Sequence, residues 1–138
     1  MKHMAIRENH LYQKAYKNGK RFVGRTVAVY VLRDYAAGRL QRENPQKIRL
    51  NRLGLSVSKK IGGAVQRNRA KRVIRAAYDT LCHDLKTGFL IVISARGAIE
   101  GKKSTQVAEE LLYAFTQLGL LPASAEERTN KKENKQTT

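Results

Sequence analysis

The chain has 138 residues, 41% of them hydrophobic, which suits one domain with a modest core. Its formal charge of +17, from 28 Lys and Arg against 11 Asp and Glu, exceeds what solubility requires. This charge predicts a polyanionic partner, with nucleic acid favoured over an anionic membrane. We expect one domain over residues 1–121 and a disordered polar tail over 122–138.

The compartment follows from two absences in the sequence. No stretch approaches the roughly 18 apolar residues of a membrane span, and the first residues lack the apolar run of a signal peptide. The single cysteine, Cys82, can form no intrachain disulfide and is expected to be a semi-buried apolar residue. We therefore expect a cytoplasmic protein.

The first expected element is a short helix that Asn9 caps and Gly19 ends. Tyr12 and Tyr16 lie on adjacent turns of its apolar stripe, so both can be core residues. They are also flanked by cations, and aromatic residues among cations are what a groove for single-stranded RNA needs. The flanking cations are Lys14, Lys17, Lys20 and Arg21.

Strands are expected next, on either side of an irregular segment. Val27–Leu32 is rich in β-branched residues and predicts a strand, whereas residues 33–51 contain Gly38, Pro45 and five cations and predict a loop or an extended hairpin. Arg52–Ser58 alternates as a strand does. One face carries Leu53, Leu55 and Val57, and the other carries Gly54, Ser56 and Ser58. The small face either leaves room for a groove or simply faces solvent.

The stretch Ser58–Tyr78 predicts a helix with two different faces. From Ala70 its apolar residues recur at helical spacing, and Gly62 and Gly63 precede it, where they free the first-turn amides for phosphate. Asn68, Arg72 and Arg75 project opposite the apolar stripe, with Arg69 and Lys71 on the flanks. Seven cations without an acid could be a solvated face, but their mutual repulsion favours a polyanionic partner. These cations are Lys59, Lys60, Arg67, Arg69, Lys71, Arg72 and Arg75.

The last elements are a buried strand and a helix. The apolar run Phe89–Ile93 predicts a strand covered on both sides, and residues 104–118 predict a helix that Gly119 and Pro122 end. The expected fold class is therefore α/β, an α+β sandwich in the order α-β-β-β-α-β-α. It has a sheet of roughly four strands packed with helices.

The sequence offers no catalytic site. Metal-dependent RNA hydrolysis needs clustered carboxylates, and metal-free hydrolysis needs a placed pair of histidines with a cation. The carboxylates and the three histidines are scattered along the chain. We therefore expect no catalytic residue and no metal bound by the protein alone, so that any chemistry lies with a partner.

The segment from Arg52 to Arg75 closely resembles the signature of the bacterial ribonuclease P protein subunit. The match includes the Arg-Asn-Arg core at Arg67, Asn68 and Arg69, set within the pattern Lys-x-Gly-x-Ala-Val-x-Arg-Asn-x-x-Lys-Arg. A weaker resemblance extends from about Arg7 to Leu118. It implies the rare left-handed β-α-β crossover seen in this family, where the general rule demands a right-handed one.

The resemblance also implies the partners. In this family the RNA subunit holds the metal ions and cleaves, and the protein binds that RNA and the 5′ leader of precursor tRNA. Mg²⁺ is thus expected through the RNA partner, with no membrane and no protein partner required. The expected RNA-subunit-binding residues are Lys59, Lys60, Arg67, Asn68, Arg69, Lys71, Arg72 and Arg75. The expected leader-binding residues are Tyr12, Tyr16, Lys14, Lys17, Arg21, Ser56 and Ser58.

Two other classes of protein are compatible with the charge. A general basic RNA-binding or ribosome-associated protein would bind RNA without regard to leader length. A stand-alone nuclease would cleave precursor tRNA without added RNA. Binding measured against leader length tests the first alternative, and an RNA-free cleavage assay tests the second.

Overall fold

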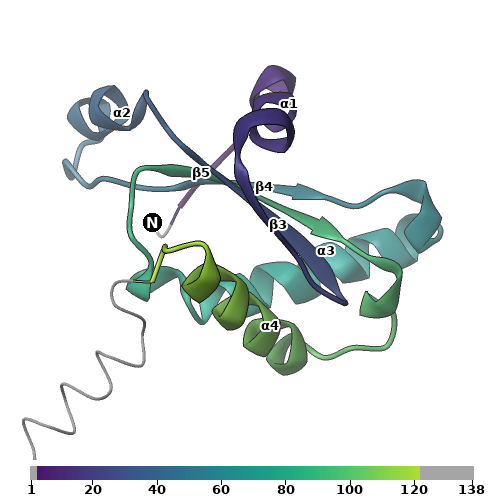
Figure 1. Ribbon diagram of the computed structural model, residues 1–138. Coiled ribbons are helices and arrows are strands. Elements are labelled where there is room, and N and C mark those ends of the chain that lie inside the picture. Colours follow the sequence, from purple (N-terminus) through teal and green to yellow (C-terminus); the bar gives the residue numbers. More distant parts are fainter. Residues whose placement is uncertain (1–2, 122–138) are drawn as a thin grey trace, which may run out of the picture.

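The computed structural model describes residues 3–121, which form a five-stranded sheet and four α-helices (Figure 1). The strands are β1 (Met4–Ala5), β2 (Lys20–Val23), β3 (Val27–Arg33), β4 (Arg52–Ser56) and β5 (Phe89–Ala95). The helices are α1 (Asn9–Asn18), α2 (Ala37–Glu43), α3 (Ala64–Asp79) and α4 (Ser104–Gln117). In this described part, no helix is both long and apolar enough to cross a membrane.

The sheet is mixed, with strand order β1-β4-β5-β3-β2. β2, β3 and β5 pair antiparallel, while β1, β4 and β5 pair parallel. β5 is central, and its residues from Leu90 to Ile93 are buried, as its unbroken apolar run predicts.

Helices cover both faces of the sheet (Figure 1). The larger core lies between the sheet and the pair α3 and α4, where Ile74, Tyr78, Leu111 and Phe115 are fully buried. A smaller core lies under α1 and centres on Ala15. Its other buried members are Ile6, Leu90 and Val92. The two faces therefore carry different helices, and only the α1 face has a single helix across it.

The parallel strands β4 and β5 are joined through α3. In Figure 1 both strands run to the right, with α3 beneath the sheet and β3 in front of β5. β4 pairs with β5 on the side opposite β3, so β4 lies behind β5 in this view. From the end of β4 the chain returns to the left through α3 below the sheet, and it then enters β5 in front of β4. This connection is left-handed, as the family resemblance implies and against the general preference.

The expected α/β fold class is confirmed, but some boundaries and elements differ. The prediction of a loop or hairpin over residues 33–51 is wrong, because Ala37–Glu43 is the helix α2. The edge strand β1, of two residues, gave no periodic signal. Asn9 is the first helical residue of α1 rather than its cap, and the preceding Glu8 makes no side-chain capping bond. The tail expected over 122–138 lies outside the described residues.

Candidate RNA-binding interface

The α1 face of the sheet is organised in rows of side chains that run across the strands. Strand register places Arg21 opposite Tyr30, Tyr30 opposite Val92 and Val92 opposite Gly54. Directly paired residues point to the same face, so these four residues form one row across β2, β3, β5 and β4. The row lies on the side of the sheet that α1 covers, because Val92 belongs to the core under α1.

Both tyrosines of α1 rest on this row. Tyr12 lies so close to Gly54 that a Cβ atom there would stand 2.6 Å from the Cε1, Cζ and Oη atoms of Tyr12. Tyr16 meets Tyr30 edge-on, with ring centroids 4.8 Å apart. Burial raises the pKa of the Tyr12 phenol, and the nearby Tyr16 raises it further. A hydrogen bond with the Leu55 backbone lowers this pKa by a smaller amount. Both residues are half-buried, so each packs on the sheet and stays in part exposed.

The next row beyond the tyrosines carries small side chains on β3, β5 and β4, and it ends on β2 at the exposed Val23. Register pairs Ala28 with Ser94 and Ser94 with Ser56. Both serines are half-buried. The groove floor expected from Gly54, Ser56 and Ser58 is thus rearranged, since Gly54 lies under the Tyr12 ring and Ser58 follows the end of β4. Sequence reasoning missed Ala28 and Ser94, because only strand register brings them beside Ser56.

The cations expected around the tyrosines do not all share their side of α1. Arg21 is exposed and lies opposite Tyr30, next to the ring that Tyr16 contacts. Lys17 is exposed in the last turn of α1. Lys14 lies about 160–200° around the helix from the tyrosines, and its Nζ stands over the Tyr35 ring at 5.7 Å. The structure therefore brings Arg21 to the tyrosines and turns Lys14 toward α2.

The cationic face of α3 has the expected orientation. Ala70, Ile74 and Ala77 are buried, while Arg72 and Arg75 are exposed. Exposed residues on the same helix also include Asn68 and Arg69, and Lys71 is half-buried. Lys59 and Lys60 are exposed in the 3-10 turn Lys59–Ile61 that leads into the helix through Gly62, whose φ of 144° favours glycine.

The two arginines of the Arg-Asn-Arg core both contact the protein and are not fully solvated cations. Arg67 is half-buried, and within the described residues its Nε is buried without a hydrogen-bond partner. Arg69 Nη2 donates a hydrogen bond of 3.0 Å to the Lys102 carbonyl oxygen. Arg69 thereby ties α3 to the loop that precedes α4.

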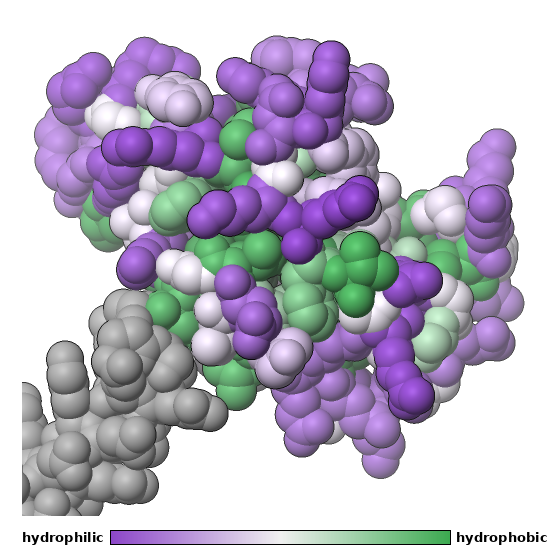
Figure 2. All heavy atoms as spheres, viewed as in Figure 1, coloured by the Kyte–Doolittle hydropathy of each residue, from purple (hydrophilic) through white to green (hydrophobic). Residues whose placement is uncertain are grey.

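A hollow of about 170 Å³ lies between Tyr12 of α1 and the cationic helix α3. Tyr12 lines it from α1, and Lys71 and Arg75 line it from α3, with Leu53 and Leu55 of β4 between them. The two expected binding surfaces therefore meet at one edge of the sheet. Figure 2 shows hydrophilic side chains gathered over α1 and α2 above the sheet.

The carboxylates of the described residues do not gather into a metal-binding cluster. Among them, no group of three or more His, Cys, Asp and Glu residues could hold a metal ion. Two carboxylates instead support the fold: Asp34 pairs with Arg52, and Glu110 accepts hydrogen bonds from the Thr26 amide at 3.0 and 3.2 Å. The cationic arrangement of α3 is suited to binding a polyanion.

Comparison with known proteins agrees with this geometry. The family model "Ribonuclease P" matches residues 1–119. The chain is 35% identical over 121 residues to the ribonuclease P protein component of Clostridium acetobutylicum, covering 88% of this chain and 93% of that protein. It is 33% identical over 120 residues to the one of Oceanobacillus iheyensis, covering 87% and 90%.

Solved structures show the same fold. The Staphylococcus aureus RNase P protein superposes with a TM-score of 0.65 at 28% identity, covering 85% of this chain and 96% of that one. The Thermotoga maritima RNase P protein gives a TM-score of 0.66 at 23% identity, covering 82% and 96%, and supports the fold alone. The chain belongs to the bacterial ribonuclease P protein family and is the protein component of an endoribonuclease, in which it assists processing of the 5′ leader of precursor tRNA.

Proposed function

We propose that this chain binds two RNAs through adjoining surfaces: the leader of precursor tRNA along the α1 side of the sheet, and the catalytic ribonuclease P RNA along α3. The observation that carries the proposal is the hollow shared by Tyr12, Lys71 and Arg75, which makes the two surfaces continuous. When the catalytic RNA binds α3, the leader of a precursor tRNA bound to that RNA would lie within reach of the α1 side of the sheet. The bacterial relatives support action in the cytoplasm.

The leader surface is assigned by its shape and chemistry. Tyr12 and Tyr16 lie over the row next to Ala28, Ser94 and Ser56, and the small side chains of this second row would let an RNA strand approach the sheet. An unpaired nucleotide can stack on the exposed part of a tyrosine face while its phosphates meet Arg21 and Lys17. Stacking of this kind accepts any base, which suits leaders of varied sequence. Ser58, exposed just beyond β4, extends the same surface.

The RNA-subunit surface is assigned by charge. Arg72, Arg75 and Asn68 are exposed on one face of α3, and Lys59 and Lys60 continue it at the N-terminal end. Such a face binds phosphates and gains affinity from released counterions. In this proposal the RNA partner holds the Mg²⁺. The protein's part is to bind and orient.

Reconstitution tests the proposal. The chain should restore cleavage of precursor tRNA by a bacterial ribonuclease P RNA at a Mg²⁺ concentration at which the RNA alone is inactive. Affinity should increase with leader length until the groove is filled. Binding that ignores the leader would instead favour a general RNA-binding protein, and cleavage without added RNA would show a stand-alone nuclease.

A further inference from the structure

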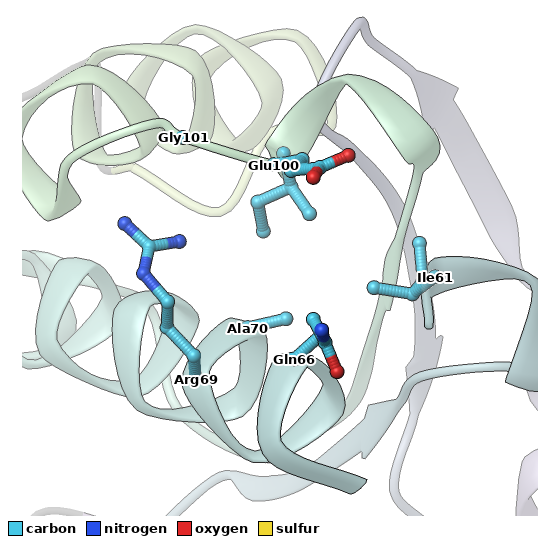
Figure 3. A pocket seen from close by; sticks show the side chains of 7 residues that line it. Ile61, Gln66, Arg69, Ala70, Glu100 and Gly101 are labelled. Carbon is cyan, nitrogen blue, oxygen red and sulfur yellow. The ribbon is translucent and has the colours of Figure 1, made fainter. Parts of the chain in front are cut away.

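A second hollow, separate from the leader groove, lies on the α4 side of α3. It has a volume of about 320 Å³ and opens between the start of α3, the turn Lys59–Ile61 and the loop before α4 (Figure 3). Its lining residues are Ile61, Gln66, Arg69, Ala70, Ile99, Glu100 and Gly101. We propose that this hollow, the Arg69 slot, receives one unpaired nucleobase of the RNA bound to α3. This inference rests on the proposed RNA-binding function.

The shape of the Arg69 slot fits a flat ring. Figure 3 shows the Arg69 side chain along one side, Ile61 on the opposite side and Ala70 on the floor between them. The hydrogen bond from Arg69 Nη2 to the Lys102 carbonyl holds the guanidinium in place as a wall. Unpaired RNA bases stack on arginine planes and pack on apolar side chains, and both surfaces face this space.

The chemistry of the slot favours a base over a phosphate. Three of its lining residues, Ile61, Ala70 and Ile99, are apolar, and Glu100 places a carboxylate at the rim. An apolar wall gives a phosphate no hydrogen bonds, and a carboxylate repels it. Gln66 supplies the groups that a base edge needs, because its amide both donates and accepts hydrogen bonds. The phosphate of the same nucleotide can reach Arg72, which lies one turn along the helix from Arg69.

Arg69 differs from the neighbouring arginines of α3 in how firmly its guanidinium is held. Arg72 and Arg75 have no hydrogen bond to another described loop that would fix them, as Arg69 has with Lys102. A fixed guanidinium loses little freedom when a ring stacks on it, whereas a mobile one is suited to following a phosphate. Arg69 is therefore assigned to base recognition, and Arg72 and Arg75 to the backbone.

The first experiment uses the full chain and small probes. The four nucleoside monophosphates are titrated separately, and ribose 5-phosphate serves as the probe that lacks a base. Amide chemical shifts of Ile61, Gln66, Arg69 and Gly101 should move with the nucleotides and stay still with ribose 5-phosphate. Equal shifts with both kinds of probe would show a phosphate site, and no shift at these amides would overturn the slot.

The second experiment uses a variant that keeps the charge. Arg69→Lys retains a cation but loses the planar surface. Arg39→Lys is the matched control, because Arg39 is an exposed helical arginine that pairs with Glu43 on α2, outside the proposed binding surfaces. Because stacking contributes roughly 1–3 kcal/mol per base, Arg69→Lys should weaken binding of a bacterial ribonuclease P RNA by about fivefold or more with an unchanged salt slope. Arg39→Lys should stay within about twofold, since Arg39 takes no part in either proposed surface.

The two experiments separate this inference from the proposed function. If wild-type protein restores cleavage and Arg69→Lys binds RNA as tightly as wild type, the slot is wrong and the function stands. If wild-type protein does not bind ribonuclease P RNA, the proposed function fails. The mononucleotide titration would then still show whether the Arg69 slot binds a nucleobase. A thermal melt of Arg69→Lys, which also loses the geometry of the bond to Lys102, shows whether weakened binding reflects a loosened loop.

Discussion

Arg52 and Asp34 form a two-pronged ion pair between the start of β4 and the end of β3. Arg52 Nε lies 2.7 Å from Asp34 Oδ2, and Arg52 Nη2 lies 2.9 Å from Oδ1. The exposed fraction of the side chain is only 11% for Arg52 and 2% for Asp34. The hydrogen bond with Asp34 raises the pKa of Arg52, although burial acts in the opposite direction. Asp34 also accepts a hydrogen bond from the Ala36 amide, so the pair fixes the point where α2 leaves the sheet.

Removal of one partner of this pair should destabilise the fold strongly. Asp34→Ala removes the buried counter-ion of Arg52 and leaves only the more exposed Glu8, and the expected loss is about 3–5 kcal/mol in the free energy of unfolding. Glu8→Ala is the matched control, because Glu8 is half exposed and lies 3.5 Å from Arg52. It should cost no more than about 1 kcal/mol. Urea unfolding of both variants measures the difference, and equal losses would contradict the assignment.

RNA-subunit binding should depend steeply on salt through the exposed face of α3. Each neutralised phosphate contributes about 0.7–0.9 to the log–log slope of affinity against salt, so the double change of Arg72 and Arg75 to Ala should flatten that slope by somewhat more than one unit. Arg39→Ala is the control, since Arg39 pairs with Glu43 on α2, away from α3. An unchanged slope in a folded double variant would argue against phosphate contacts from these two residues.

Stability should fall in alkaline solution because of Tyr78. Burial raises the pKa of this phenol above its usual 10.0, so the native state holds its proton after the unfolded state has lost its own. The contribution of protonated Tyr78 to the free energy of unfolding is therefore fully present below about pH 10, and it decreases as the pH rises further. Tyr78→Phe should flatten this decrease relative to wild type in urea unfolding between pH 8 and 11. Tyr113→Phe, at an exposed position, should follow the wild-type curve.

Much of the fold could be predicted because its signals are local. The two faces of α3 follow from apolar spacing and cation placement alone, and the run at β5 identifies the central strand without any tertiary information. α2 escaped prediction because it is short, contains Gly38 and buries only Ala37. No local pattern separates such a helix from a loop with the same polar residues.

The candidate site was less predictable, because it depends on contacts between distant segments. Tyr12 could be placed on α1, but its contact with Gly54 depends on where α1 crosses the sheet. Ser94 joins Ser56 only through the register of β4 and β5. The pairing of Arg52 with Asp34 likewise joins two residues that no sequence spacing connects. Sequence patterns therefore predict the kinds of residue in the candidate site, and the topology determines which of them lie together.

Tyr16 should contribute to leader binding more than to binding of the tRNA body. Tyr16→Ala removes a ring whose stacking is worth roughly 1–3 kcal/mol per base, so precursor tRNA should bind about tenfold or more weakly and mature tRNA almost unchanged. Its contact with Tyr30 means that some stability is lost as well, and a thermal melt measures that loss. If the ring serves only the core, both RNAs should lose affinity in proportion to the melt.

The small-residue row should be as important as the aromatic rings beside it. Ser94→Leu places a larger side chain between Ser56 and Ala28, and it fills the space above the sheet without disturbing the opposite face, where Ile93 is buried. We expect roughly tenfold weaker binding of precursor tRNA, the equivalent of one lost stacked base, with mature tRNA and the melting temperature little changed. Thr105→Leu, an exposed change in the first turn of α4 across the sheet, is the matched control. Full leader affinity in a folded Ser94→Leu protein would show that the leader does not lie along this row.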